Sequence, residues 1–180
     1  MRRTTGLIVV IFVLVTSSTL FGSTDALLRA ADSGDSTRVA GLLASKENPN
    51  AADTTMTTAL MMAARGGHIG VIKALLSAGA DVTRVDANGW TALMYSVRYN
   101  KIDAVQHLLT SGSDPNRGDN DGNTPLMYAT RDGHAQVVRV LLSHKANTES
   151  KNKRDKTAMD WAKRAGDEGI IALLKDAGSQ

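Results

Sequence analysis

The stretch Asp86–Asn116, DANGWTALMYSVRYNKIDAVQHLLTSGSDPN, decides the fold because it is one copy of a repeated unit. Sliding the sequence by 33 residues places apolar residues on apolar residues without an insertion or deletion. Three sets of equivalent positions are Leu27, Leu60, Leu93, Leu126 and Met159; Val39, Ile72, Val105, Val138 and Ile171; and Leu42, Leu75, Leu108, Leu141 and Leu174. A fixed period of this length is typical of a stacked array in which each unit contacts only its neighbours.

Each unit has the sequence features of two helices joined by a turn. The first helix is predicted to begin at a capping residue whose side-chain oxygen accepts a first-turn N–H: Asp25, Thr58, Thr91, Thr124 and Thr157. It is predicted to end at a residue that tolerates left-handed backbone: Gly34, Gly67, Asn100, Gly133 and Gly166. The second helix carries a buried apolar face, as in Val71, Ile72, Leu75 and Leu76. Polar stretches at 80–88 and 113–121 predict turns that project from the stack.

Residues 1–23 have the features of a secretory signal peptide. Two arginines near the start precede the apolar run Gly6–Val15, and cleavage is expected after Gly22 or Ser23. The polar segment Thr16–Thr19 interrupts the run, which is shorter than the ~20 apolar residues that span a bilayer. A cleaved signal is therefore the favoured interpretation.

Two alternatives for this segment remain open. Residues 6–22 could be retained as a membrane anchor, or they could form a buried N-terminal helix. A lipid-anchored lipoprotein is excluded because the chain has no cysteine to carry the lipid.

Composition excludes several classes of function. The formal net charge of +3 falls to about +1 without the two arginines of the signal segment, which does not favour nucleic acid or anionic lipid as a partner. The absence of cysteine excludes disulfides, thiolate metal sites and a cysteine nucleophile. The four histidines have no metal-ligand spacing, and no nucleophile, base and orienting group converge, so we expect neither a cofactor, nor a metal site, nor catalysis.

Three segments carry a family resemblance: TALMMAARGGHIGVIKALLSAGADV, GWTALMYSVRYNKIDAVQHLLTSGSDPN and DGNTPLMYATRDGHAQVVRVLLSHKAN. They resemble the ankyrin repeat, which implies an all-α helix-turn-helix solenoid with projecting β-turns or hairpin loops. About five repeats are expected within residues 24–180, at about 24–52, 53–85, 86–118, 119–151 and 152–180. The chain departs from the family where His often follows the Thr-Pro-Leu, since it has Met61, Met94, Met127 and Asp160 there. We expect apolar packing by these methionines instead.

The resemblance implies binding of another protein through the concave face formed by the turns and first helices. Candidate contacts, carried over by position, are Asn88, Trp90, Arg98, Tyr99, Asn123, Arg131, Asp132, Arg65 and Arg164. Trp90 has the polar counterparts Thr57, Asn123 and Lys156, so the fold does not require an apolar side chain there. Its indole is interpreted as an exposed interface anchor, the alternative being that it folds back over the next turn.

Two further sets of equivalent residues run along the stack. One is Arg65, Arg98, Arg131 and Arg164, which is either a line of like charges open to an acidic partner or an ordinary solvated face. The other is Met62, Tyr95, Tyr128 and Trp161, which we expect to pack between first helices with the tyrosine hydroxyls reaching water. An exposed aromatic stripe is the alternative.

The function expected from the sequence is non-catalytic protein binding by a monomer that is secreted or periplasmic, in the manner of an inhibitor or immunity-like protein. The alternative is a membrane-tethered scaffold, should the N-terminal segment be retained. Neither nucleic acid nor a cofactor is expected, and the membrane is a partner only if the anchor persists.

Overall fold

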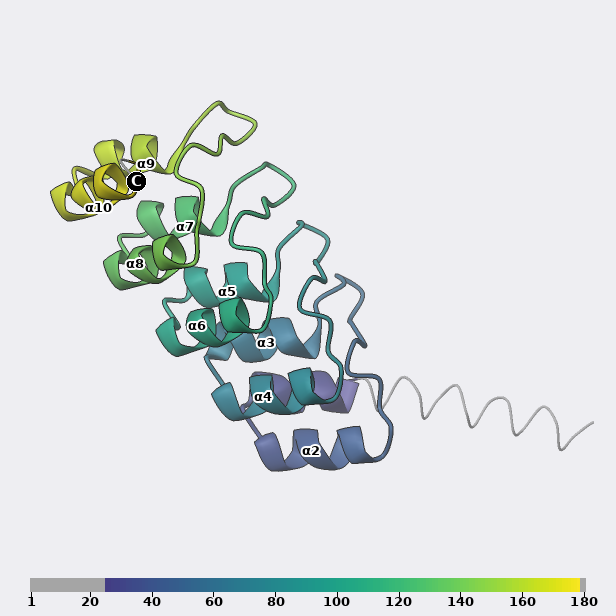
Figure 1. Ribbon diagram of the computed structural model, residues 1–180. Helices are drawn as coiled ribbons and strands as arrows, with labels where there is room; N and C mark the ends of the chain where they lie inside the picture. Colours follow the sequence, from purple (N-terminus) through teal and green to yellow (C-terminus); the bar gives the residue numbers. More distant parts are fainter. Residues whose placement is uncertain (1–24, 179–180) are drawn as a thin grey trace, which may run out of the picture.

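The computed structural model describes residues 25–178, which form paired helices stacked in one direction (Figure 1). The first helices of the repeats are residues 25–32, α3 (Ala59–Gly66), α5 (Ala92–Arg98), α7 (Pro125–Arg131) and α9 (Ala158–Ala165). The second helices are α2 (Ser36–Ala44), α4 (Ile69–Ser77), α6 (Ile102–Thr110), α8 (Ala135–Ser143) and α10 (Glu168–Gly178). The predicted signal segment, residues 1–23, lies outside the described residues.

The first helices begin where the capping residues predict, with one exception. The hydroxyls of four threonines accept the N–H three residues on: Thr58, Thr91, Thr124 and Thr157. Asp25 already has helical backbone and pairs with Arg29 one turn later, so its predicted capping role is wrong. The helix ends are confirmed, because φ is positive at all four predicted glycines and is 53° at Asn100.

The core is a continuous apolar layer between the helices of successive repeats. Met61, Met94 and Met127 are at most 2% exposed, which confirms that methionine packs where the family often has histidine. The two sides of the stack differ, since the first helices contact one another more extensively than the second helices do. Small residues allow that close approach: Ala30, Ala63, Ser96, Ala129 and Ala162. The stack therefore curves with the first helices on its concave side.

A hairpin precedes each of the first helices α3, α5, α7 and α9, and these hairpins project from the same side of the stack (Figure 1). Each hairpin is named after its repeat, so that the second hairpin precedes α3 and the fifth precedes α9. In the third repeat, Asp86 Oδ1 accepts the backbone N–H groups of Asn88 and Trp90, both at 2.8 Å. Adjacent hairpins are joined by backbone hydrogen bonds, as where the N–H of Asn120 donates to the carbonyl of Asn88 at 3.0 Å. The concave face therefore consists of linked hairpins and first helices. No helix within residues 25–178 has the length and apolarity to cross a bilayer.

Candidate protein-binding face

Trp90 lies between two tyrosines of successive repeats. Its ring centroid is 5.3 Å from that of Tyr95 in its own repeat and 4.8 Å from that of Tyr128 in the next repeat. The indole is partly buried, and it packs against the core. The indole is therefore less exposed than the sequence-based interpretation expected, because its ring covers Tyr128 of the next repeat; its role as an interface anchor stays a prediction.

The hydroxyls of Tyr95 and Tyr128 bond to aspartates of the protein, which corrects the expectation that they reach water. Tyr95 donates to Asp86 Oδ2 at 2.9 Å, and Tyr128 donates to Asp119 Oδ2. Burial, together with the neighbouring Asp86 carboxylate, raises the pKa of Tyr95 to about 12. The pKa of Tyr128 is raised further by the same two causes. Packing between repeats, the favoured interpretation of this ladder, is observed for Tyr128, whose ring contacts Trp90 of the preceding repeat.

The arginine ladder is not a line of unpaired like charges. Arg65 donates to Asp32 at 2.7 Å, where Asp32 occupies the ladder position of the preceding repeat. Arg98 and Arg131 both contact Asp132, at 2.7 Å and 3.2 Å. Arg131 also lies over the Tyr128 ring at 4.8 Å. Each of these three guanidinium groups therefore contacts a carboxylate within the protein, and Arg98 and Arg131 share one.

Arg164 differs from the other three arginines of the ladder. It lies over the Trp161 ring at 5.8 Å and forms no salt bridge within residues 25–178. Arg164 and Trp161 line a hollow together with Lys156 and Asp160.

Tyr99 is a large hydrophobic side chain that the fold leaves exposed. It follows α5 as its C-cap residue and is 51% exposed. The hydrogen bond that Arg65 of the preceding repeat donates to Asp32 raises the pKa of Arg65, and Tyr99 lies close enough to make a smaller contribution in the same direction. Tyr99 thus lies near Arg65 of the preceding repeat and next in sequence to Arg98, and both of these arginines contact aspartates.

Comparison with known proteins agrees with this architecture. The sequence matches the family model for ankyrin repeats (3 copies) over residues 27–119 and 99–180. The chain belongs to the ankyrin-repeat family. No curated protein matched the chain.

Ankyrin repeats generally mediate protein–protein interactions and are typically non-catalytic. Within the part of the chain that the structure describes, no group of His, Asp and Glu residues is placed to hold a metal ion.

The two predicted asparagines have different environments in this ankyrin stack. Asn88 is exposed on the third hairpin, beside Trp90 and the side chains of the fourth hairpin. Asn123 is engaged within the stack, because its amide nitrogen donates to Asp119 and its amide oxygen accepts from Asn152 Nδ2 at 2.7 Å. Asn88 is therefore available to a partner, whereas Asn123 joins the fourth and fifth hairpins.

Sequence reasoning missed two features of the ankyrin surface. Asp32 stands one repeat before Arg65, so extending the arginine ladder backwards would have identified its acidic partner. Met56 is 50% exposed at the second hairpin, where the third and fourth repeats have Gly89 and Gly122. The sequence could have indicated an exposed Met56, because Met56 occupies the repeat position of those turn glycines.

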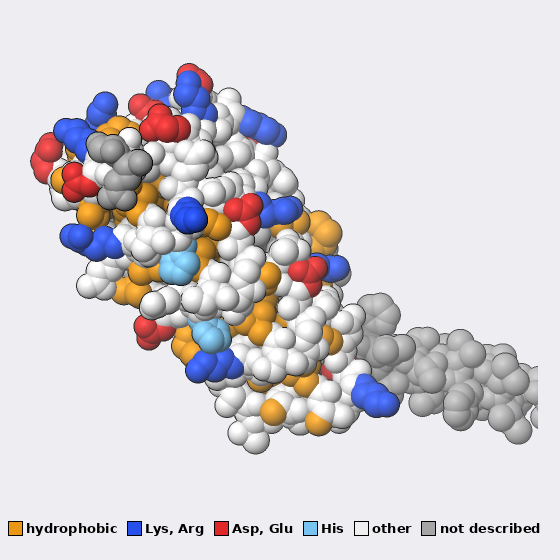
Figure 2. All heavy atoms as spheres, viewed as in Figure 1, with side chains coloured by type: hydrophobic (Ala, Val, Ile, Leu, Met, Phe, Trp, Pro, Cys, Tyr) orange, Lys and Arg blue, Asp and Glu red, His pale blue; other side chains and the backbone are white. Residues whose placement is uncertain are grey.

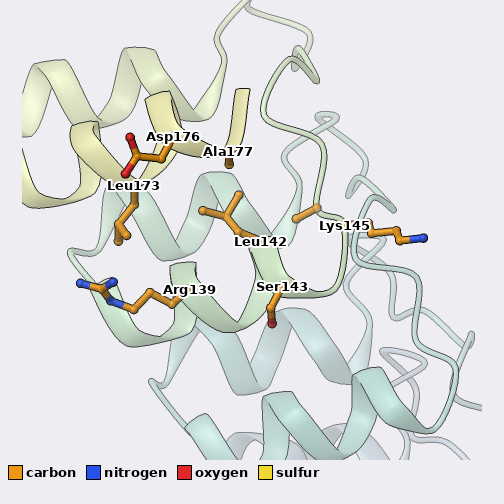
Figure 3. Close-up of a pocket in the computed structure, with 8 residues that line it drawn as sticks. Arg139, Leu142, Ser143, Lys145, Leu173, Asp176 and Ala177 are labelled. Carbon is orange, nitrogen blue, oxygen red and sulfur yellow. The ribbon is translucent and has the colours of Figure 1, made fainter. Parts of the chain in front are cut away.

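A separate hollow lies on the outer side of the stack, between α8 and α10 (Figure 3). Its walls are Arg139, Leu142 and Ser143 from α8 and Leu173, Asp176 and Ala177 from α10. It contains none of the residues predicted to bind a partner, and it is built from second helices. The predicted residues instead lie on the hairpins, as for Asn88, Trp90 and Asn123, or at the C-terminal ends of α3, α5, α7 and α9.

Proposed function

We propose that this ankyrin-repeat protein is a non-catalytic, extracytoplasmic binder of another protein, secreted or periplasmic, and that it engages its partner through the concave face. Its biological role would be to hold or neutralise that partner, as an inhibitor or immunity-like protein does. The expected signal segment at residues 1–23 supports the location.

The observation that carries the proposal is the exposure of Tyr99 beside charged groups that are already ordered. Large amphipathic rings and arginines are enriched among the residues that dominate binding energy at protein interfaces. Tyr99 is 51% exposed and lies on the same face as Arg98, which Asp132 holds by a 2.7 Å salt bridge. Its ring therefore offers apolar area that the fold does not use.

Preorganisation of the neighbouring arginines would limit the cost of binding. An arginine that is free in solution loses side-chain conformational entropy when a partner immobilises it. Arg65, Arg98 and Arg131 already contact Asp32 or Asp132. Their remaining N–H groups can donate to a partner while the side chains keep the conformation that they have in the free protein.

The decisive experiment compares Tyr99→Ala with the wild-type protein in binding to the partner captured from the extracytoplasmic fraction. We expect the affinity for that partner to fall at least about tenfold, while circular dichroism and the unfolding midpoint stay unchanged because Tyr99 is outside the core. Tyr99 is a better probe than Trp90, since removing Trp90 would also open space between two packed tyrosines.

The matched control is Gln106→Ala, which removes an exposed side chain from α6 on the outer side of the stack. It is expected to bind as the wild type does. Equal binding by all three proteins would overturn the concave-face proposal. The location is tested separately by the mass of the protein isolated from cells: cleavage after Gly22 or Ser23 supports export, and a retained segment would instead indicate a membrane-tethered scaffold.

A further inference from the structure

Positive charge on the concave face is concentrated in the last repeat. Earlier in the stack, Arg65, Arg98 and Arg131 contact aspartates. Arg164, in contrast, contacts an aromatic ring and no carboxylate within residues 25–178. The equivalent position in the first repeat is the acidic Asp32, so the ladder changes along the stack from arginines that contact a carboxylate to one that does not.

The hairpin before α9 extends this basic region. Lys153, Arg154 and Lys156 are exposed on it and form no salt bridge within residues 25–178. Figure 2 shows Lys and Arg side chains over this hairpin, at the top of the stack. The acidic residue of the hairpin tip, Asp155, is paired with Lys151 at 2.9 Å. The basic side chains therefore outnumber the carboxylates that could compensate them.

A second carboxylate of the region, Asp160, is committed to the start of α9. It accepts the backbone N–H of Thr157 at 2.8 Å and the Thr157 hydroxyl at 3.0 Å. These two bonds, with a smaller contribution from Lys156 and Lys163, lower the pKa of Asp160. Asp160 thus serves as a helix cap, and within residues 25–178 neither Lys156 nor Arg164 forms a salt bridge with it.

A hollow of about 250 Å³ connects the hairpin to the ladder. Trp161 contributes an indole to its wall, and Lys156 and Arg164 contribute cationic groups on either side of Asp160 in sequence. An aromatic surface next to two cations can bind the aliphatic stem of a glutamate while the cations bind its carboxylate.

We propose that the basic end, defined as Lys153, Arg154, Lys156, Trp161 and Arg164, binds a short acidic segment of the partner protein. The inference rests on the proposed function as a protein binder and names the chemistry of one part of that partner. Glutamate or aspartate side chains would contact the hairpin, and one of them would enter the hollow beside Trp161.

The neighbouring hairpin limits the occupant to a short segment. It carries Asp119 and Asp121, and the carbonyl of Asp121 accepts the backbone N–H of Lys153 at 2.8 Å. An extended polyanion or a flat anionic membrane lying across both hairpins would meet these carboxylates as well. A peptide segment that ends at the fifth repeat avoids that repulsion.

The test uses the intrinsic fluorescence of Trp161 in a Trp90→Phe background, which leaves one tryptophan in the protein. The protein purified from expressing cells is titrated with a short peptide of Glu, Leu and Gly, and separately with its Gln counterpart. We expect saturable binding of the Glu peptide with a change in Trp161 fluorescence, and no such change with the Gln peptide. Added salt should weaken the binding, because the contacts are solvent-exposed.

Two sets of variants assign the binding to the basic end. The double variant Lys153→Glu with Arg154→Glu should weaken binding of the Glu peptide at least about tenfold, and so should Arg164→Gln. The matched control reverses two exposed charges in other repeats, Arg38→Glu with Arg117→Glu, and should bind as the parent does.

Several outcomes would overturn the inference: equal binding of the Gln peptide, equal loss in the charge-reversal control, or binding of phosphatidylglycerol vesicles in place of the peptide. A failure here is separable from a failure of the proposed function. If Tyr99→Ala abolishes capture of the cellular partner while the Glu peptide never binds, the concave face stands as the binding face and only its acidic ligand is rejected.

Discussion

Tyr95 donates its hydroxyl proton to Asp86 Oδ2 over 2.9 Å, while the other oxygen of Asp86 accepts the N–H groups of Asn88 and Trp90. One buried carboxylate therefore holds the hairpin in shape and ties it to α5. Tyr128 and Asp119 repeat the arrangement one unit later. The aromatic ladder thus sets the angle between the hairpins and the first helices, in addition to filling space between repeats.

Removing the Tyr95 hydroxyl should destabilise the protein without changing its fold. Tyr95→Phe leaves Asp86 Oδ2 without this donor in a site where Asp86 is 4% exposed. We expect the free energy of unfolding to fall by about 1–2 kcal/mol, measured by urea denaturation. Tyr99→Phe is the control: its hydroxyl lies on an exposed ring, and a comparable loss there would contradict the assignment.

The same contact predicts a loss of stability at alkaline pH. The pKa of Tyr95 is raised to about 12 in the folded protein, against about 10 in an unfolded chain. The unfolded state therefore loses this proton first. The stabilisation that the Tyr95 hydroxyl gives to the folded state is complete below about pH 10 and disappears as pH rises through about 12. Unfolding midpoints measured across this range should fall less steeply for Tyr95→Phe than for wild type. Parallel curves would refute the linkage.

The second hairpin has a residue poorly suited to its backbone. Met56 has φ of 63°, at the position that Gly89 and Gly122 occupy with φ of 79° and 78°. A side chain in left-handed backbone costs about 1 kcal/mol relative to glycine, and this one is half exposed. Met56→Gly should therefore raise the free energy of unfolding by up to about 1 kcal/mol in thermal or urea unfolding.

The converse substitution is Gly89→Ala, which should lower stability. A Cβ at residue 89 would approach the backbone nitrogen of Asn120 to 2.7 Å, so the adjacent hairpin would have to move. The cost should exceed that of the left-handed conformation alone, which is about 1 kcal/mol. A neutral Gly89→Ala would show that the hairpins are not rigidly linked.

Asp132 should keep Arg98 and Arg131 from repelling each other. Its side chain is 13% exposed and contacts both guanidinium groups. Asp132→Asn is expected to cost about 1 kcal/mol, since the two arginines are themselves partly solvated. The difference from wild type should shrink in 1 M salt, where charges are screened within about 3 Å. A loss that is independent of salt would point to packing instead.

The helices and their ends were predictable because their causes are local and recur every 33 residues. An equivalent threonine caps each of α3, α5, α7 and α9, and a residue that tolerates positive φ follows the end of each of these helices. Apolar positions shared by all repeats must face the core, because each repeat buries the same surfaces against its neighbours. The repeat positions of the candidate binding residues also predicted that they lie on the hairpins and on or next to the first helices.

The partners of those residues were decided only by the tertiary structure. Arg65 meets Asp32 and Arg98 meets Asp132 across a boundary between repeats, so each pairing depends on residues 33 or 34 positions apart. Trp90 is covered because a tyrosine happens to follow in the next repeat, where other repeats place different neighbours. Periodicity establishes what the repeats share, namely the backbone and the core. The side chains that differ from one repeat to the next acquire their environment only when the repeats are stacked, because stacking brings them within contact distance.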